Sequence, residues 1–293
     1  MMQLQWTTAG RPARVVILGA RGFLGRALAA KLAAAGLPQL VIGSADIDLT
    51  ADGAAKALAA RLQPDDALVM LSAVTPDKGR DVDVSLRNLA MGRNVCAALA
   101  ETPCAHVVYI SSDAVYPFTT GLVSERTPAA PMDLYGSMHR MRELMFEAAV
   151  KAPLAILRPT MVYGADDTHN SYGPNRFRRQ AAQDGKITLG GGGEETRDNI
   201  YIDDAVRLIE LTLLHRASGK LNLASGRSLS AHALATLIAN YFPTPIEIVT
   251  TPRALPVTHR SFDITACRKA FPTFAFTPLE TGLAVAHRAA SAP

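Results

Sequence analysis

The sequence predicts an α/β fold, a doubly wound parallel sheet with helices on both faces. Short β-branched, apolar runs alternate with longer Ala- and Leu-rich periodic stretches through the first half of the 293-residue chain. This alternation is typical of βαβ units. In addition, the first apolar run leads directly into a glycine-rich turn over residues 19–25, which opens a helical stretch.

The first half contains five expected strands and four expected helices. Each apolar run is bounded by Gly, Pro or polar residues, and the first helical stretch ends at Gly36, a good helix stop. The expected strands are 14–18, 40–43, 67–71, 106–110 and 154–158, and the expected helices are 23–35, 54–62, 84–99 and 134–150.

The second half is different, because residues 164–197 are rich in Gly, Asp, Asn and Arg. We expect helices at 175–183, 203–214 and 230–241, with short strands at 187–189 and 221–223. The predicted domains are therefore a dinucleotide-binding domain, residues 12–163, and a smaller substrate-binding region, residues 164–293. Parts of this second region are expected to return to the first domain, so that the two are interleaved.

The turn Gly19-Ala-Arg-Gly22-Phe-Leu-Gly25 is spaced as a dinucleotide-binding loop. Gly19 allows the tight turn from strand to helix, and Gly22 allows the backbone to approach a pyrophosphate. Gly25 permits close packing of helix on strand, and the helix N-terminus attracts phosphate. This loop predicts a Rossmann-type domain that binds NADP or NAD.

Residues after the second strand favour NADP over NAD. Asp46 lies near the distance expected of an acid that holds the ribose diol, but it follows the expected strand end at Gly43-Ser44. Gly43 leaves room for a 2′-phosphate, with which the guanidinium of Arg21 could pair. Asp48-Leu49 is expected to contact the adenine.

Two segments predict a proton-transfer site. Ile110-Ser-Ser-Asp-Ala-Val-Tyr116 is a strand end rich in hydroxyls, and Tyr135-Gly-Ser-Met-His139 opens a helix. Residues four apart share one helix face, so Tyr135 and His139 can point into one cleft. A hydroxyl, a phenol and an imidazole beside a bound cofactor would suit proton transfer.

Bulk properties exclude several other classes. The net charge of +4 is mildly basic, and the one compact basic run, 176–179, is too short to predict nucleic-acid binding. Three cysteines without metal spacing predict reduced thiols in a cytoplasmic protein, and no metal site is expected. We expect no signal peptide and no membrane span.

The combined motifs resemble the extended short-chain dehydrogenase/reductase family, in its nucleotide-sugar epimerase, dehydratase and reductase branch. The resemblance covers nearly the whole chain. Its markers are the glycine loop, Asp48-Leu49, Asn88, 110–116, Tyr135-Gly-Ser, Leu157-Arg-Pro-Thr-Met-Val-Tyr-Gly164 and Arg197-Asp-Asn-Ile-Tyr-Ile-Asp-Asp204.

The resemblance implies roles for individual residues. Ser112 would hydrogen-bond the reacting oxygen of the sugar, Tyr135 would be the acid/base, and Arg197 would pair with a phosphate of the substrate. Surface pairing of Arg197 with Asp198 or Glu195 is the alternative. The further expected cofactor contacts are Phe23, Leu24, Ser72, Ala73, Pro159 and Val162, and the further expected substrate contacts are Thr75 and Asp113.

His139 departs from the family, which has a lysine at this position. The lysine would lower the pKa of the tyrosine and hold the nicotinamide ribose, whereas an ordinary histidine is mostly neutral at neutral pH. Three outcomes stay open. His139 takes the lysine role, with or without a raised pKa of its own, or the enzyme is slow or uses Tyr135 as an acid in reduction, or the chain binds without efficient turnover.

Ala114 narrows the expected reaction. Dehydratases of this branch carry a glutamate there, so 4-epimerisation or 4-ketosugar reduction is favoured. Met161 stands where many epimerases have asparagine, so sugar specificity does not carry over directly. The alternatives are a cofactor-binding sensor or scaffold, and a reductase of a non-sugar carbonyl. The resemblance also implies a homodimer, formed through the helices at 84–99 and 134–150.

Overall fold

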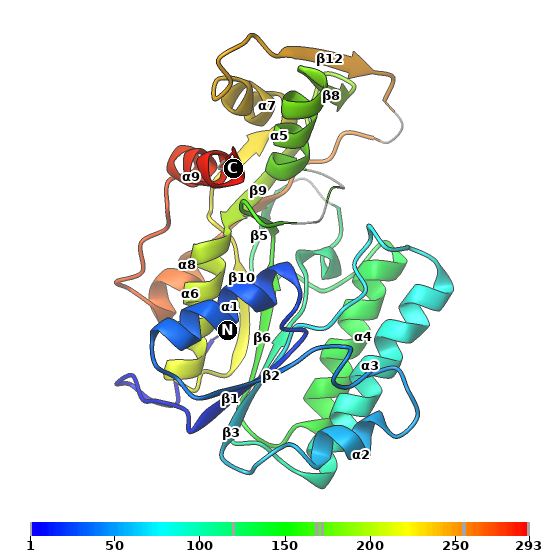
Figure 1. The fold of residues 1–293 in the computed structure, drawn as a ribbon, viewed down its shortest axis with the longest axis vertical. Coiled ribbons are helices and arrows are strands. Elements are labelled where there is room, and N and C mark those ends of the chain that lie inside the picture. Colours follow the sequence, from blue (N-terminus) through cyan, green and yellow to red (C-terminus); the bar gives the residue numbers. More distant parts are fainter. Residues whose placement is uncertain (1, 119–120, 168–169, 171–172, 254–255, 292–293) are drawn as a thin grey trace.

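A six-stranded parallel sheet forms the centre of the molecule (Figure 1). The computed structural model describes residues 2–118, 121–167, 170, 173–253 and 256–291. In spatial order the strands are β10 (Gly219–Leu223), β6 (Leu154–Pro159), β4 (His106–Ile110), β3 (Asp66–Met70), β1 (Arg14–Leu18) and β2 (Gln39–Ile42). The strand order reverses at β1, where doubly wound sheets bind their ligands beyond the carboxyl ends of the strands.

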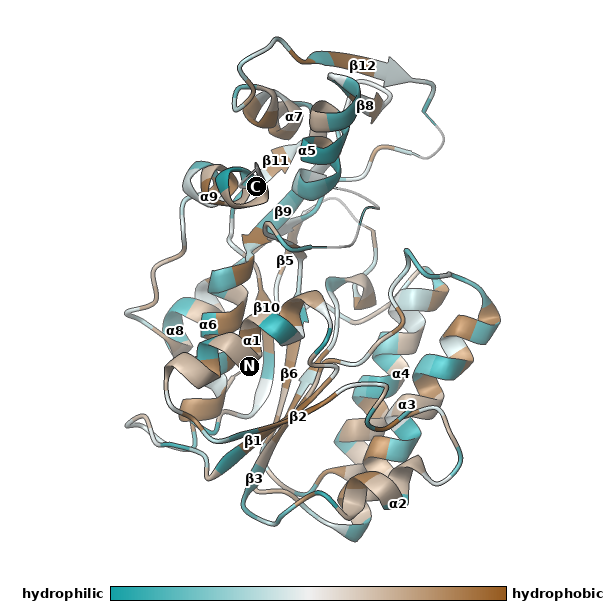
Figure 2. Cartoon of the chain, in the orientation of Figure 1, coloured by the Kyte–Doolittle hydropathy of each residue, from teal (hydrophilic) through white to brown (hydrophobic). Residues whose placement is uncertain are grey.

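Alternate side chains of each strand enter two different cores. Val15 and Ile17 of β1 pack with one set of helices, and Val16 and Leu18 pack with the other. All four are fully buried. A parallel strand covered on both faces is apolar along its whole length, and Figure 2 shows the strands coloured accordingly.

Two layers of helices cover the sheet. The helices α1 (Phe23–Ala34), α6 (Ile202–Leu214) and α8 (Thr265–Ala270) cover one face, and α2 (Ala54–Ala59), α3 (Val82–Glu101) and α4 (Leu134–Ala149) cover the other. Aspartates begin the two long helices. Asp81 caps α3 by accepting from Val84 N, and Asp133 caps α4 by accepting from Gly136 N.

A smaller lobe stands beyond the carboxyl ends of the strands (Figure 1). It has a core of its own, built from α5 (Gly173–Asp184), α7 (Ala231–Ala239), α9 (Leu279–Ser291) and β8 (Lys186–Gly190). The short strands of this part pair as β11–β9–β7, β12–β8 and β13–β5. Their bounds are β5 (Leu122–Val123), β7 (Met161–Tyr163), β9 (Thr196–Tyr201), β11 (Ser228–Ser230), β12 (Glu247–Thr251) and β13 (Ser261–Phe262), and a 3-10 turn, η1, spans Asp113–Val115.

The structure confirms the predicted fold class. Every expected strand and helix is present, with ends that differ by a few residues; the expected helix 54–62, for example, ends at Ala59. The strand β10 and the helix α6 lie in the main layers although they follow residue 164.

Candidate active site

The glycine loop lies at the carboxyl end of β1 and touches the loop after β3. Gly19 has a φ of +88°, and a Cβ on it would lie 2.8 Å from the amide nitrogen of Ser72. A Cβ on Gly25 would lie 2.3 Å from the carbonyl oxygen of Gly19, so α1 packs closely on the turn. These two positions therefore require glycine, for a positive φ and for close packing.

The start of α1 is suited to a phosphate. No side chain of the described residues caps the helix at Gly22, so the first N–H groups, including those of Phe23 and Leu24, remain available. A Cβ on Gly22 would lie 3.3 Å from the Gly19 carbonyl and would crowd this surface. The residues present thus fit the pyrophosphate of a dinucleotide.

Arg21 lies across the end of β2. Its side chain is 2.9 Å from where a Cβ of Gly43 would stand, and its guanidinium is 3.9 Å from Asp46. Asp46 also accepts a hydrogen bond from Gly43 N at 2.8 Å. The arginine is exposed, so its charge can turn toward a group bound beyond β2.

Asp48 and Leu49 stabilise the chain after β2. Asp48 accepts two hydrogen bonds from Thr50, and these bonds lower the pKa of the carboxyl. The Leu49 side chain is buried in the core under α2, and its carbonyl accepts from Asn94. The buried side chain of Leu49 does not reach an adenine. A contact from the Asp48 side chain or from the backbone of this pair stays a prediction.

Asn88 fixes the loop after β3. Its side chain accepts from Val74 N and donates to Val74 O, at 2.8 and 3.1 Å. Ser72 and Ala73 are half-buried beside Asn88. Further along the same loop, the Thr75 hydroxyl donates to the Asp77 carboxylate. Because Ser72 also packs on Gly19, two of the predicted cofactor-lining segments meet here.

Ser112 and Tyr135 lie together because two elements approach each other closely. The Ser112 hydroxyl begins η1 by accepting from Ala114 N at 3.1 Å. A Cβ on Gly136 would lie 2.1 Å from the Ala114 carbonyl, so glycine lets α4 begin against η1. This contact brings the Tyr135 phenol near the Ser112 hydroxyl, whose hydrogen-bonding influence lowers the pKa of Tyr135, and both residues line the same cleft.

The site holds Tyr135 in its protonated form. Burial and the charge of Asp113 raise the pKa of Tyr135, whereas the charge of Arg142 and the hydrogen bond with Ser112 oppose that rise. With the pKa raised above its ordinary value of about 10, the phenol is a proton donor at neutral pH.

His139 is buried behind Tyr135, with the two ring centres 4.7 Å apart and nearly perpendicular. The Tyr109 hydroxyl hydrogen-bonds His139 Nδ1 at 2.7 Å. Burial, and then the charge of Arg142, lower the pKa of His139 well below its ordinary value. The possibility that His139 gains a raised pKa is thus not what the structure supports, and the imidazole is neutral at pH 7.

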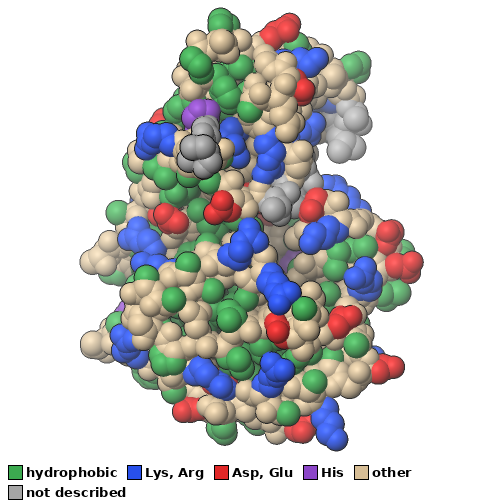
Figure 3. Space-filling view, in the orientation of Figure 1, with side chains coloured by type: hydrophobic (Ala, Val, Ile, Leu, Met, Phe, Trp, Pro, Cys, Tyr) green, Lys and Arg blue, Asp and Glu red, His purple; other side chains and the backbone are tan. Residues whose placement is uncertain are grey.

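A cleft of about 720 Å³ opens in front of the pair and is large enough for a nucleotide-sized ligand. Ser112, Asp113, Tyr135 and Met161 line its floor, while β8, β9 and α7 of the smaller lobe line the opposite side. In the face shown in Figure 3, Lys and Arg side chains lie around the middle of the molecule, where the two parts meet. The arginines that line the cleft are Arg80, Arg176, Arg197 and Arg260.

Arg197 is held by uncharged partners rather than by the acids suggested as its alternative. It donates to the carbonyl and hydroxyl of Thr258, at 2.8 and 2.6 Å. Asp198 instead accepts from Thr160 and Ser225. The guanidinium of Arg197 therefore brings positive charge to the cleft without a carboxylate bound to it among the described ion pairs.

Arg260 is a site residue that no sequence motif marks. It is only 4% exposed, so it is not a surface cation. Its guanidinium pairs with Asp113 at 2.8 Å and donates to the carbonyls of Tyr116 and Pro117. This pair fixes the segment that carries Ser112. No signal in the sequence joins residues this far apart.

Pro159 ends β6 and Val162 lies in β7, where the neighbouring Met161 lines the cleft. Thr160 between them donates to Asp198, which ties this strand end to β9. That this segment lines the nicotinamide therefore remains a prediction.

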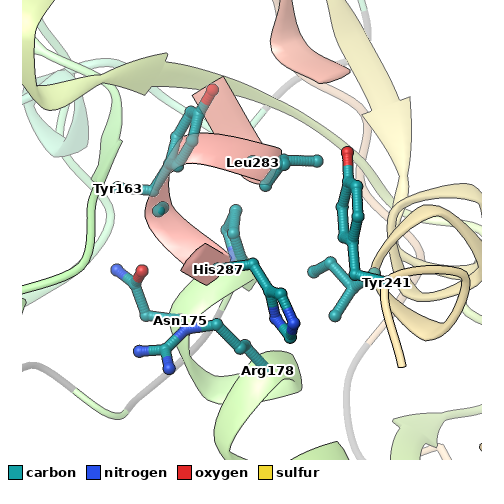
Figure 4. A pocket seen from close by; sticks show the side chains of 9 residues that line it. Tyr163, Asn175, Arg178, Tyr241, Leu283 and His287 are labelled. Atoms are coloured by element: carbon teal, nitrogen blue, oxygen red, sulfur yellow. The ribbon is translucent and has the colours of Figure 1, made fainter. Parts of the chain in front are cut away.

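A second hollow, between α5, α7 and α9, has a volume of only about 10 Å³ (Figure 4). The figure shows the His287 ring between Arg178 and Tyr241. This volume holds about one water molecule, so it is not a substrate site. Within the described ranges, no group of three or more His, Cys, Asp or Glu side chains is placed to bind a metal ion. None of the described helices is both long and apolar enough to cross a bilayer.

The sequence identifies the family. Residues 15–224 match the NAD dependent epimerase/dehydratase family, and the chain therefore belongs to it. Over 137 residues it is 31% identical to the N-acetyl-alpha-D-glucosaminyl-diphospho-ditrans,octacis-undecaprenol 4-epimerase of Escherichia coli O157:H7, covering 45% of this chain and 40% of that one. Over 130 residues it is 33% identical to the dTDP-L-rhamnose 4-epimerase of Burkholderia thailandensis, covering 42% and 36%. The matched segment spans less than half the length of these curated relatives.

Solved structures share the fold over nearly the whole chain. MoeE5 in complex with UDP-glucose and NAD superposes with a TM-score of 0.82 at 22% identity, covering 94% of this chain and 97% of that one. Epimerase Mth375 from Methanothermobacter thermautotrophicus gives 0.84 at 20% identity, covering 95% and 92%. These likenesses show the fold, whereas the family match over residues 15–224 confirms the resemblance drawn from the motifs.

Proposed function

We propose that this chain is an NAD(P)-dependent enzyme that acts at carbon 4 of a nucleotide-activated sugar, as a 4-epimerase or a 4-ketosugar reductase. The observation that supports this most is the Ser112–Tyr135 pair, which lies on the floor of the arginine-lined cleft. The two curated relatives described above are 4-epimerases by name, which favours epimerisation. The raised pKa of Tyr135 favours proton donation and hence the reductive half of either reaction.

Each residue of the pair has a distinct task. A bound dinucleotide, held by the glycine loop and the start of α1, would accept or supply the hydride. Ser112 would hold the carbon-4 oxygen by a hydrogen bond. Tyr135 would give that oxygen a proton when a carbonyl is reduced, or remove one when an alcohol is oxidised. Arg197 would hold a phosphate of the substrate across the cleft.

Dehydration is less well supported by these residues. The residue that follows Asp113 is Ala114, which offers no carboxylate to take a proton from carbon 5. Asp113 itself is held by Arg260, so it is not free to serve as that base. We therefore propose that the reaction ends after hydride and proton transfer.

The cofactor we propose is NADP, with NAD as the alternative. Arg21 stands at the end of β2, beside Gly43, where a guanidinium would meet a ribose 2′-phosphate. Asp46 is within 3.9 Å of this guanidinium and would favour an NAD ribose diol instead. The dissociation constants for NADP and NAD test which cofactor is preferred: tighter NADP binding supports the role of Arg21, and tighter NAD binding supports that of Asp46.

We further propose a homodimer through α3 and α4, in the cytoplasm. Large apolar side chains are exposed on these neighbouring helices, namely Val82, Leu86, Leu134, Met141 and Leu144. A second copy of the chain would cover them as a four-helix contact. The three cysteines are free thiols, as is usual in a reducing compartment.

A substrate panel tests the proposal. Epimer pairs of UDP-, dTDP- and GDP-sugars are incubated with protein and NAD, and the sugars are separated by chromatography. The corresponding 4-ketosugars are incubated with NADPH, and loss of reduced cofactor is followed. A polyprenyl diphosphosugar is included, because one relative acts on such a compound by name. Tight cofactor binding with no conversion in any arm would contradict the proposal and favour a non-catalytic binding protein.

A further inference from the structure

Arg142 lies on the reactive face of α4. It follows His139 by three residues and Tyr135 by seven, and residues at these spacings share one face of a helix. The side chain is fully buried, with its guanidinium carbon 5.1 Å from the centre of the Tyr109 ring. On the facing helix a Cβ at Gly92 would lie 3.2 Å from Arg142 Cγ, so glycine there gives the arginine stem its space.

The charge of Arg142 has no carboxylate partner among the described ion pairs. The neighbouring Glu143 binds Arg158 at 2.7 Å and Arg140 at 2.9 Å instead. One nitrogen of Arg142 donates to the Ser72 carbonyl at 3.0 Å, whereas Nε and the other terminal nitrogen are buried without any hydrogen-bond partner in the described chain. A buried, unpaired cation is costly, so a purely structural role does not explain it.

This cation reaches the cofactor loops. Ser72, which accepts from Arg142, packs directly on Gly19 of the glycine loop. One turn earlier on the same helix, His139 Nε2 is also buried without a partner in the described chain. Arg142 thus bonds the loop that packs against the glycine loop, and it keeps unsatisfied donors near the place where the fit of that loop puts a dinucleotide.

We propose that Arg142, and not His139, is the permanent cation of the reaction site, a positioning residue that acts through Tyr135 while His139 stays a neutral hydrogen-bonding group. This rests on the proposed function. The other ionisable groups around Arg142 are Cys96 on α3, Tyr109 on β4, and Tyr135, His139 and Glu143 on its own helix. Tyr135 also faces Asp113 and Asp133, whose negative charges Arg142 offsets.

The variant R142M removes the charge but keeps an apolar side chain, and R142K keeps the charge. With R142M, the apparent pKa of Tyr135 in the pH–rate profile should rise by about one unit or more, because a nearby cation lowers it by that order. Alcohol oxidation requires the phenolate of Tyr135 as a base, so its rate at neutral pH should then fall roughly tenfold or more. R142K, and the double variant H139K/R142M, should restore much of the profile. S137A, at an exposed position of the same helix, is the matched control.

A second readout does not depend on turnover. Imidazole NMR signals follow the titration of His139, identified by its loss in H139Q. Because the cation of Arg142 opposes protonation, R142M should raise the pKa of His139, and R142K should not. The melting temperature of R142M should stay near that of the wild type, since the variant buries no unpaired charge.

The outcomes separate cleanly. An R142M variant that is less stable but keeps both the His139 titration and the pH–rate profile of the wild type would overturn the assignment. If the wild type turns over no sugar nucleotide, the proposed function fails. In that case the His139 titration and the cofactor affinity of R142M still test whether Arg142 is the cation of the site, because both should differ from those of the wild type.

Discussion

Replacing Gly136 with alanine should separate stability from activity. The new Cβ would lie 2.1 Å from the Ala114 carbonyl oxygen, so α4 and η1 must move apart by about 1.3 Å to reach an ordinary contact of 3.4 Å. Alanine favours a helix over glycine by about 1 kcal/mol, which offsets part of the cost of this movement. The separation displaces Tyr135 from Ser112, and a misplacement of about 1 Å can cost about 100-fold in rate.

The expected result for G136A is a fall of about 100-fold in kcat/KM, or about 2.7 kcal/mol, with cofactor affinity near the wild-type value. Steady-state kinetics and cofactor titration measure the two quantities. S137A is the control, because Ser137 is the next residue and is exposed. If G136A keeps more than half of the wild-type activity, the close contact between α4 and η1 does not position Tyr135, and the reasoning is refuted.

Three further predictions concern the cofactor, the buried charges and the assembly. R21A should weaken NADP binding and leave NAD binding nearly unchanged; equal losses by titration calorimetry would count against a 2′-phosphate contact. E143Q should destabilise the fold by roughly 3–5 kcal/mol in chemical unfolding, because it leaves Arg158 buried and unpaired. Burial raises the pKa of Glu143 but its bonds to Arg158 lower it more, so this carboxylate stabilises the fold above its unfolded pKa of about 4.3 and the effect is lost as pH falls through the lower, folded pKa. The melting temperature of E143Q should thus depend less on pH in acid, and an unchanged slope would be evidence against this linkage. L144E should convert a dimer into a monomer in analytical ultracentrifugation; a wild-type monomer would exclude the proposed contact.

The regular part of the fold could be predicted from local pattern. The strand at 14–18 and the glycine turn after it are found where the sequence places them, because burial on both faces demands unbroken apolar runs. Several short strands were not predicted, among them β9, whose sequence TRDNIY is largely polar, and β5, which has two residues. Such strands form through tertiary pairing, which leaves little local signal.

The candidate site divides in the same way. Ser112, Tyr135 and His139 could be located from two short motifs. Arg142 and Arg260 could not, because their importance comes from burial and from partners distant in sequence, Ser72 and Asp113. The neutral state of His139 likewise depends on how deeply α4 buries it. Charge states of buried groups are set by tertiary packing, which a motif does not encode.

The central claim is that Tyr135 exchanges a proton with the carbon-4 oxygen of a sugar nucleotide, which Ser112 holds, while hydride moves to or from a dinucleotide. The most direct measurement uses a substrate with deuterium at carbon 4, whose product is examined by NMR. An epimerase should return the label to carbon 4 of the epimer. Y135F should form none of this labelled epimer while still binding cofactor. A product formed with loss of the label to solvent, or full activity in Y135F, would contradict the account.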